Sequence, residues 1–176
     1  MHYLCSMPSP VGILTAASDG EQITGLWIAG QKYYADTLPH GAREQDVPIF
    51  ASLRHWLAIY FSGKHPDFLP PLAPTGSAFR HAVWKILGEI PYGEVMTYGD
   101  IAQQLAARTG QQQSAQAVGG AVGHNPISIL IPCHRVVGAD GSLTGYAGGL
   151  DAKVHLLRLE GAFRETFYVP TRGTAL

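Results

Sequence analysis

The stretch TYGDIAQQLAARTGQQQSAQAVGGAVG, residues 97–123, predicts two short helices joined by a polar loop. Thr97 and Asp100 have the spacing of a capping box, in which two side groups satisfy backbone N–H groups at the start of a helix. Ser114 can cap the second helix, and the loop is predicted at 108–113. The inward positions of the first helix are Ile101, Ala102, Leu105 and Ala106. Two short helices joined by a turn suggest a helix-turn-helix.

Helical patterns also flank this pair. Upstream, Ser77 can cap a helix that ends at Pro91, and its apolar residues recur at the helical period. Downstream, a last helix is predicted from Asp151, closed by Gly161. The second part of the chain is therefore expected to be mostly helical.

The first part of the chain has the pattern of a small antiparallel sheet. Three short β-like runs, at 3–6, 11–17 and 23–28, are separated by turn residues. An amphipathic helix at 53–61 is expected to cover one face of that sheet. The proline-rich stretch 66–76 then reads as an extended connector.

These elements predict an α+β protein with two domains. We expect an N-terminal α/β domain at 1–75, built from the sheet and its helix, and a C-terminal domain at 76–165 with the helix pair and an active-site loop. Residues 166–176 have no usable periodicity and are expected to form a tail.

The composition is that of a globular protein, with 176 residues, 46% hydrophobic, 14% charged and a net charge of -1. The longest apolar run in a predicted helix, 56–61, is far shorter than the roughly 20 residues of a membrane span. No secretory signal is visible, so we expect a cytoplasmic protein with reduced cysteines and no membrane partner. A near-neutral charge argues against strong non-specific binding of nucleic acid.

The segment IPCHRVVG, 131–138, carries the most reactive chemistry in the sequence. It follows the apolar run 129–131, which is expected to be buried and extended, and a Gly-rich loop follows it at 138–149. A thiol that follows a proline and neighbours cations is expected to have its thiolate favoured, as a sulfur nucleophile requires. The segment therefore predicts a nucleophilic role for Cys133.

The longer string HNPISILIPCHRVVGADGSLTGYAGGLDAKVHLLRLEG, 124–161, resembles the active-site region of bacterial O6-alkylguanine-DNA alkyltransferases, also called methylated-DNA–protein-cysteine methyltransferases. The resemblance is strong over 74–163. It implies a DNA repair protein that flips an O6-alkylguanine out of duplex DNA, and it leaves open whether O4-alkylthymine is also a substrate. The alkyl group would move irreversibly to Cys133 in a single-turnover reaction, without a cofactor and with the protein as a monomer.

The resemblance assigns catalytic roles to a small set of residues. His134, through a water, would take the proton of the Cys133 thiol, and the Glu160 carboxylate would fix the tautomer of the imidazole. The Tyr98 hydroxyl would donate to N3 of the departing guanine and so stabilise the leaving group. Asn125 would brace the turn between the second helix and the active-site loop.

Backbone groups are expected to shape the base pocket. By the resemblance, the Cys133 and Val136 carbonyls accept from the exocyclic amine of guanine, and the Tyr146 ring lines the alkyl channel. The Ala147 amide would donate to O6, and Gly148 would allow close approach. Arg135 follows the Cys-His pair, where a structural role and a DNA-facing role are both open.

Small residues on the second helix would let its backbone approach the DNA minor groove without reading sequence. The expected DNA-binding residues are Thr97, Ser114, Ala115, Gln116, Ala117, Gly119 and Gly120. Many relatives have an arginine where this chain has Gln116, and glutamine lacks the cation and the stacking guanidinium. We therefore expect weaker, salt-sensitive DNA binding, and we expect no metal because Cys5 and the nearby histidines lack ligand spacing.

Two other functions remain open from the sequence. A non-catalytic alkylated-DNA damage-recognition protein would bind the lesion without taking its alkyl group, and the presence of Gln116 is compatible with this function. A cysteine hydrolase using Cys133, His134 and Glu160 would turn over many times and need no DNA.

Overall fold

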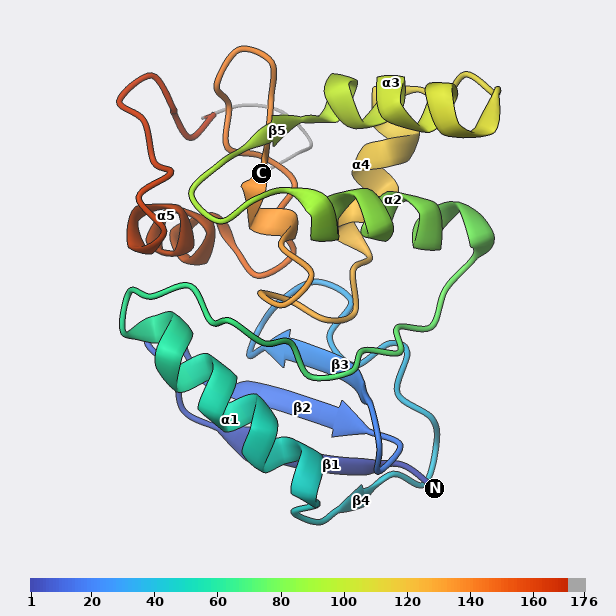
Figure 1. Cartoon of the computed structure of the whole chain (residues 1–176), viewed down its shortest axis with the longest axis vertical. Coiled ribbons are helices and arrows are strands. Elements are labelled where there is room, and N and C mark those ends of the chain that lie inside the picture. The colour runs from blue at the N-terminus through green and yellow to red at the C-terminus, as the bar shows by residue number, and fades with distance from the viewer. Residues whose placement is uncertain (171–176) are drawn as a thin grey trace. The chain divides into compact units, whose positions relative to one another are not determined.

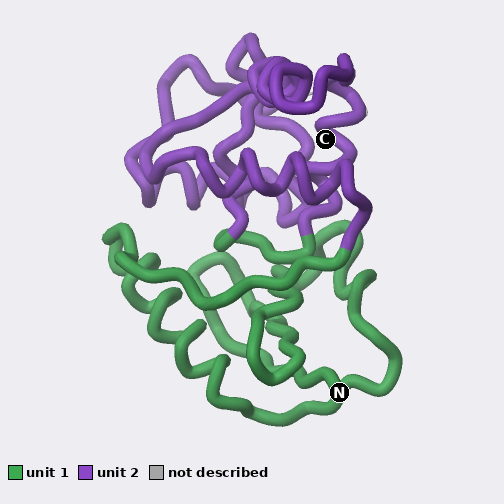
Figure 2. Tube along the Cα trace, turned by 45° about the vertical axis from the view of Figure 1, so that its right-hand side comes forward, with its two compact units in different colours: residues 1–75, 126–130 green, residues 76–125, 131–176 purple. Residues whose placement is uncertain are grey.

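The computed structural model describes residues 1–170 and divides the chain into two compact units (Figure 2). The first unit contains residues 1–75 together with 126–130. The second contains 76–125 and the chain from residue 131 onward. Residues 126–130, which lie between Asn125 and Cys133 in the sequence, thus belong to the first unit. Of the predicted tail, residues 171–176 lie outside the described residues.

Residues 1–75 form a four-stranded sheet in the order β3-β2-β1-β4 (Figure 1). Strands β1 (Tyr3–Met7), β2 (Leu14–Ser18) and β3 (Ile23–Ile28) are antiparallel, which confirms the predicted sheet. The sequence did not predict β4 (Arg43–Glu44), which pairs parallel with β1 and makes the sheet mixed. A two-residue exposed strand carries no periodicity, so the pattern had nothing to detect.

Helix α1 (Pro48–Phe61) lies across the sheet and packs on β2 (Figure 1). It begins five residues before the predicted start, because Pro48 takes the first helical position, where a missing N–H costs nothing. The helix buries Phe50, Leu53, Trp56, Leu57 and Tyr60. Burial of these side chains gives the first unit its apolar core.

The outer edge of β3 is covered by two segments that are distant in the sequence. The 66–76 connector pairs with it through an isolated bridge between Leu72 and Ile23. The second segment is 126–130. The Leu26 N–H donates to the Pro126 carbonyl at 2.8 Å, and the Ser128 N–H donates to the Leu26 carbonyl at 2.9 Å. An edge strand with unpaired backbone groups is thereby avoided.

The second unit is built from helices α2 (Ala78–Glu89), α3 (Tyr98–Thr109), α4 (Ala115–Gly123) and α5 (Leu150–Leu159). Of these, α2, α3 and α4 begin at the predicted caps, while α5 begins one residue before the predicted Asp151. The capping box of Thr97 and Asp100 is complete, and the Ser114 hydroxyl accepts from the Ala117 N–H at 3.0 Å. Helix α3 runs into the predicted loop as far as Thr109, and Gly110 ends it with a φ of 73°.

Between α4 and α5 the chain forms a 3-10 turn at Cys133–Arg135 and the short strand β6 (Val136–Val137). Strand β6 pairs parallel with β5 (Met96–Thr97), which directly precedes α3. The run 129–131 is buried as expected, but the prediction of an extended run was wrong. Ile129 has a φ of 73°, in the left-handed region, because the chain turns there rather than running straight.

No helix within the described residues combines the length and the apolar character that a membrane span requires.

Candidate functional site

Cys133 stands at the start of the 3-10 turn, with 4% of its surface exposed. The Asn125 side chain holds the turn in place, since its Nδ2 donates to the Ile131 carbonyl at 2.8 Å. The same Nδ2 lies 3.2 Å from Sγ of Cys133. Asn125 therefore does two things: it closes the loop that brings the cysteine into position, and it donates a hydrogen bond to the sulfur.

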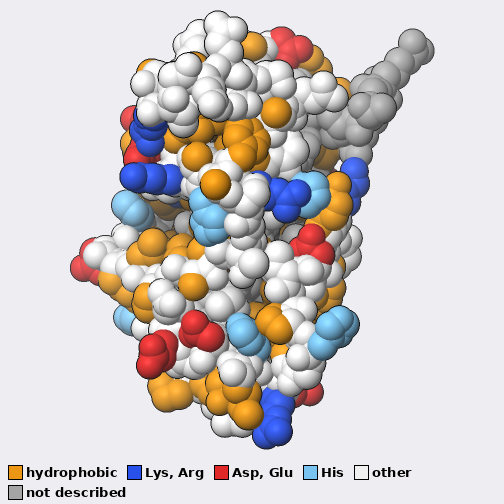
Figure 3. All heavy atoms as spheres, turned by 90° about the vertical axis from the view of Figure 1, so that its right-hand side faces the viewer, with side chains coloured by type: hydrophobic (Ala, Val, Ile, Leu, Met, Phe, Trp, Pro, Cys, Tyr) orange, Lys and Arg blue, Asp and Glu red, His pale blue; other side chains and the backbone are white. Residues whose placement is uncertain are grey.

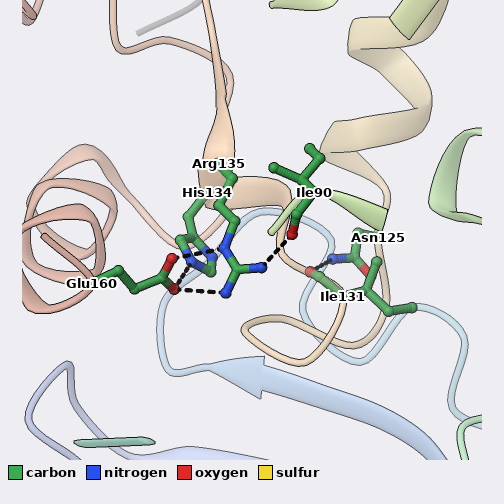
Figure 4. A network of polar contacts seen from close by, with 6 residues as sticks. All are labelled: Ile90, Asn125, Ile131, His134, Arg135 and Glu160. Carbon is green, nitrogen blue, oxygen red and sulfur yellow. Dashed lines mark hydrogen bonds and ion pairs between the residues drawn. The ribbon is translucent and has the colours of Figure 1, made fainter. Parts of the chain in front are cut away.

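His134 and Arg135, which follow the cysteine in the chain, form a buried polar network with Glu160 (Figure 4). Nε2 of His134 lies 2.6 Å from Oε2 of Glu160. Arg135 donates from Nε to Oε1 of Glu160 at 2.7 Å and from Nη2 to Oε2 at 3.1 Å. Its Nη1 donates to the Ile90 carbonyl at 2.7 Å, and the guanidinium lies over the Tyr92 ring. This answers the open question about Arg135, which is buried in a structural pair rather than facing outward.

The charge states of this network follow from burial and pairing. Burial alone would raise the pKa of Glu160, but hydrogen bonds from His134 and Arg135 outweigh it and hold the pKa at about 2. Burial lowers the pKa of His134, against the opposing pull of Glu160. The resting network is therefore a neutral imidazole held by a carboxylate whose charge is balanced by Arg135.

The expectation that neighbouring cations favour the Cys133 thiolate was wrong. Burial raises the pKa of the Cys133 thiol, and this outweighs the hydrogen bond from Asn125 and the charge of Lys153. Arg135 is paired with the Glu160 carboxylate, and His134 is neutral. Neither side chain therefore supplies the positive charge that the sequence suggested would stabilise the thiolate. The thiol is thus protonated at rest and must lose its proton during the reaction.

Lys153 is a residue of the site that sequence reasoning missed. It is fully buried on α5, and its Nζ donates to the Val136 carbonyl at 2.5 Å and to the Thr144 carbonyl at 3.0 Å. Burial lowers its pKa to about 8, against the pull of Cys133. One signal was available: Lys153 shares the inward helical face of Leu156 and Leu157, where a lysine is unusual.

Tyr98 occupies the first position of α3, where the capping box fixes the backbone. Its hydroxyl donates to the Thr144 carbonyl at 2.8 Å. Burial raises the Tyr98 pKa to about 12, so the hydroxyl remains a donor at neutral pH. An added β-carbon at Gly145, which has a φ of 72°, would lie 2.9 Å from this hydroxyl, so only glycine fits there.

The loop 138–149 carries the other expected pocket residues. The buried Tyr146 ring lies edge-on to the His134 ring, with centroids 6.4 Å apart. Ala147 and Gly148 are half-buried beside it. The Val136 carbonyl, expected to accept from guanine, already accepts from Lys153.

The expected DNA-binding residues lie mostly on the outer face of α4. Ser114, Ala115, Gln116, Ala117 and Gly120 are exposed, and Gly119 and Thr97 are half-buried. The inner face of α4 packs through Val118, Ala121 and Val122. On the face of the molecule in Figure 3, Lys and Arg side chains are scattered rather than gathered into one stripe. Residues 1–170 hold no group of three His, Cys, Asp or Glu side chains placed to bind a metal.

Two family descriptions match this chain over nearly its whole length. The ribonuclease-like domain of 6-O-methylguanine DNA methyltransferase matches residues 2–74, and the DNA binding domain of the same family matches 78–162. The chain therefore belongs to the O6-methylguanine DNA methyltransferase family.

Known relatives agree with this assignment. The methylated-DNA–protein-cysteine methyltransferase of Haemophilus influenzae is 46% identical over 159 residues, covering 90% of this chain and 86% of the relative. The protein of that name from Methanosarcina acetivorans is 41% identical over 168 residues, covering 91% and 99%. The structure of Mycobacterium tuberculosis OGT in complex with DNA matches with a TM-score of 0.80 at 41% identity, covering 91% of this chain and 93% of that one.

Proposed function

We propose that this chain is a DNA repair protein in which Cys133 takes an alkyl group from O6 of guanine. The observation that carries the proposal is the surrounding of the thiol. A buried thiol with an amide donor 3.2 Å from its sulfur is followed in the chain by His134, whose buried imidazole is paired with the Glu160 carboxylate. Such a pair is suited to accept a proton from a nucleophile.

The transfer exchanges one bond for another. A bond forms between Sγ of Cys133 and the alkyl carbon, and the bond between that carbon and O6 breaks. The thiol proton passes through a water to His134, whose depressed pKa leaves the imidazole neutral and able to accept it. Glu160 then stabilises the imidazolium.

The electron pair of the broken bond stays on guanine, where Tyr98 assists. Its hydroxyl exchanges the Thr144 carbonyl for N3 of the flipped base and stabilises the charge that develops on the leaving group. Burial keeps this hydroxyl protonated, because its pKa is about 12.

The product is a thioether, which is a poor leaving group, so each molecule acts once. The same thiol could serve a hydrolase only if a water cleared the intermediate, and a carbon–sulfur thioether offers no acyl group for water to attack. Multiple turnovers would therefore contradict the proposal.

DNA enters through the outer face of α4 in the predicted domain 76–165. The exposed small residues of that face allow the backbone to approach a groove, and extrusion of the damaged base brings O6 to the thiol. Gln116 would fill the space of the extruded base. Gln116→Arg is expected to tighten duplex binding, and the added charge should make that binding more dependent on salt. A gel-shift titration at several salt concentrations measures both, and unchanged binding would remove Gln116 from the interface.

The proposal also includes the finer expectations from the sequence. The protein acts as a monomer in the cytoplasm on duplex DNA that carries O6-alkylguanine and needs no cofactor, and the same assay with an O4-alkylthymine duplex decides whether that base is a second substrate.

Intact-protein and peptide mass spectrometry after mixing with a duplex that contains O6-methylguanine tests the proposal. We expect one added methyl group per molecule, located on Cys133, and none with an undamaged duplex. Cys133→Ala should accept no methyl group yet still bind DNA. Cys5→Ser is the matched control and should react as the wild type does.

Each other result selects a different function. Lesion-selective binding without an adduct favours a damage-recognition protein. An adduct on another residue removes Cys133 as the acceptor, and the absence of both adduct and binding directs attention to hydrolase substrates.

A further inference from the structure

Residues 166–168 lie beyond the part of the chain that matches the family's DNA binding domain, yet they are bonded to the active-site loop. The Leu143 N–H donates to the Tyr168 carbonyl at 2.8 Å, and the Tyr168 N–H donates to the Gly141 carbonyl at 3.1 Å. These bonds make a parallel bridge between Ser142 and Tyr168. We call residues 166–168 the clasp.

Side chains reinforce this bridge. The Tyr168 hydroxyl donates to Oδ2 of Asp140 at 2.5 Å, and Oδ1 of Asp140 accepts from the Ser142 N–H at 3.0 Å. Phe167 packs edge-on against Phe163, at the margin of a buried cluster that includes Leu143. The clasp is thus fixed to the start of the loop by backbone, hydroxyl and aromatic contacts together.

The loop passes directly from the clasp to the site. Thr144 follows Leu143, and its carbonyl accepts from both the Tyr98 hydroxyl and Nζ of Lys153. A shift of Leu143 would therefore move the acceptor that sets the position of the Tyr98 hydroxyl. Backbone fit is close at this point, since a β-carbon added to Gly141 would lie 2.8 Å from the Thr166 carbonyl.

We propose that the clasp, through Leu143 and the Thr144 carbonyl, holds the Tyr98 oxygen at the place from which its O–H turns to N3 of the flipped base for alkyl transfer. The inference rests on the proposed function, since it concerns a residue that acts on the leaving group. Tyr168, Phe167 and Gly141 are positioning residues, because none of them contacts the reacting atoms.

Single-turnover transfer at saturating DNA tests the inference with two variants. Gly141→Ala forces the clasp away and strains a backbone with φ of 89°, so transfer should slow by about fivefold to tenfold. Tyr168→Ala, a change to a side chain that is 46% exposed, should slow transfer less without unfolding the chain. DNA affinity should not change. Tyr34→Phe is the matched control, because this tyrosine is 45% exposed and has a hydroxyl 2.5 Å from Thr15 Oγ1 in the first unit.

A double-mutant cycle distinguishes positioning from general weakening. In a Tyr98→Phe background the hydroxyl is gone, so Gly141→Ala and Tyr168→Ala should cause little further loss of rate. The inference would be overturned if Gly141→Ala or Tyr168→Ala slowed transfer by the same factor with and without the Tyr98 hydroxyl. Wild-type rates in both single variants would also overturn it. If the wild-type protein itself transfers no alkyl group, the proposed function fails instead.

Discussion

The two units differ in the kind of polar group that they bury. Among the described residues, the first unit buries the neutral side chains of Ser18, Gln31 and Ser128. The second unit buries His134, Arg135, Lys153 and Glu160 together with Asn125. The first set forms hydrogen bonds such as the one from the Ile28 N–H to Oε1 of Gln31 at 2.7 Å, whereas the second set includes the amide that donates to the Cys133 sulfur and the ion pair of Arg135 with Glu160.

This difference separates structural polarity from functional polarity. Burial of a neutral amide or hydroxyl is nearly compensated by one hydrogen bond. Burial of a charge is expensive, and apolar residues of similar volume would often stabilise the fold as well or better. A unit that keeps several buried charged groups at such a cost is therefore expected to use them in chemistry.

The largest expected effect is that of Glu160→Gln. It leaves the Arg135 charge buried without a balancing carboxylate, and we expect a loss of about 3 to 5 kcal/mol of stability together with a severe loss of transfer. Glu89→Gln is the matched control, because its ion pair with Arg108 is exposed and screened by solvent, so its loss should change stability little. Denaturant titration and single-turnover assays measure both variants. Equal losses of stability and transfer at the two positions would contradict the special role of the buried charges in the second unit.

Lys153→Met should have the next largest effect. Methionine fills a similar volume but removes the donor to the Val136 carbonyl, at a cost of about 1 to 3 kcal/mol, while the Thr144 carbonyl keeps only the Tyr98 hydroxyl of its two side-chain donors. Transfer should also slow, because the Thr144 carbonyl holds Tyr98. The same substitution at the exposed Lys85 on α2 should leave stability and transfer unchanged. Wild-type transfer by Lys153→Met would make this lysine purely structural.

Acidification should weaken both stability and transfer. The folded pKa values of His134 and Glu160 both lie below their ordinary values, so each group stabilises the fold above its unfolded pKa. That stability is lost as pH falls through the folded pKa, beginning below about 6.5 for His134 and about 4.3 for Glu160. Transfer should be constant near neutral pH and fall up to tenfold per pH unit once His134 protonates. Rates and melting temperatures from pH 8 to 4 measure this, and a rate that rises on acidification would exclude His134 as the base.

The smallest effect is expected for Ser128→Ala in the first unit. The Ser128 hydroxyl donates to Oε1 of Gln31 at 3.3 Å, and its loss should cost about 0.5 to 1.5 kcal/mol with no change in the transfer rate. Chemical denaturation and a single-turnover assay of this variant sharpen the comparison. A slower transfer at unchanged stability would show that neutral polarity in the first unit also serves the reaction.

Features that depend on neighbouring residues were predictable from the sequence. The caps at Ser77, Thr97 and Ser114 all formed, because a cap needs only a side chain and a backbone N–H three residues away. The segment around Cys133 stood out because few residue types perform nucleophilic chemistry.

Features that depend on residues distant in the sequence could not be predicted. The left-handed turn at Ile129 is imposed by pairing of 126–130 with a strand a hundred positions earlier in the sequence, which no local pattern reports. The raised pKa of Cys133 depends on burial and on the pairing of Arg135 with Glu160, both set by tertiary packing. The clasp lay in a stretch without periodicity, and its backbone bonds to the loop depend on no particular side chain.

The pairing of Pro126–Leu130 with β3 also bears on how the protein is made. A nascent chain emerges from the ribosome N-terminus first, and most domains fold in that order. Here the first unit lacks part of its sheet edge until residue 130 of 176 has been synthesised. By then the sequences of α2, α3 and α4 have already been translated. The first unit therefore cannot be completed before most of the second has been translated, and the segment that leads to Cys133 is the last piece to enter it.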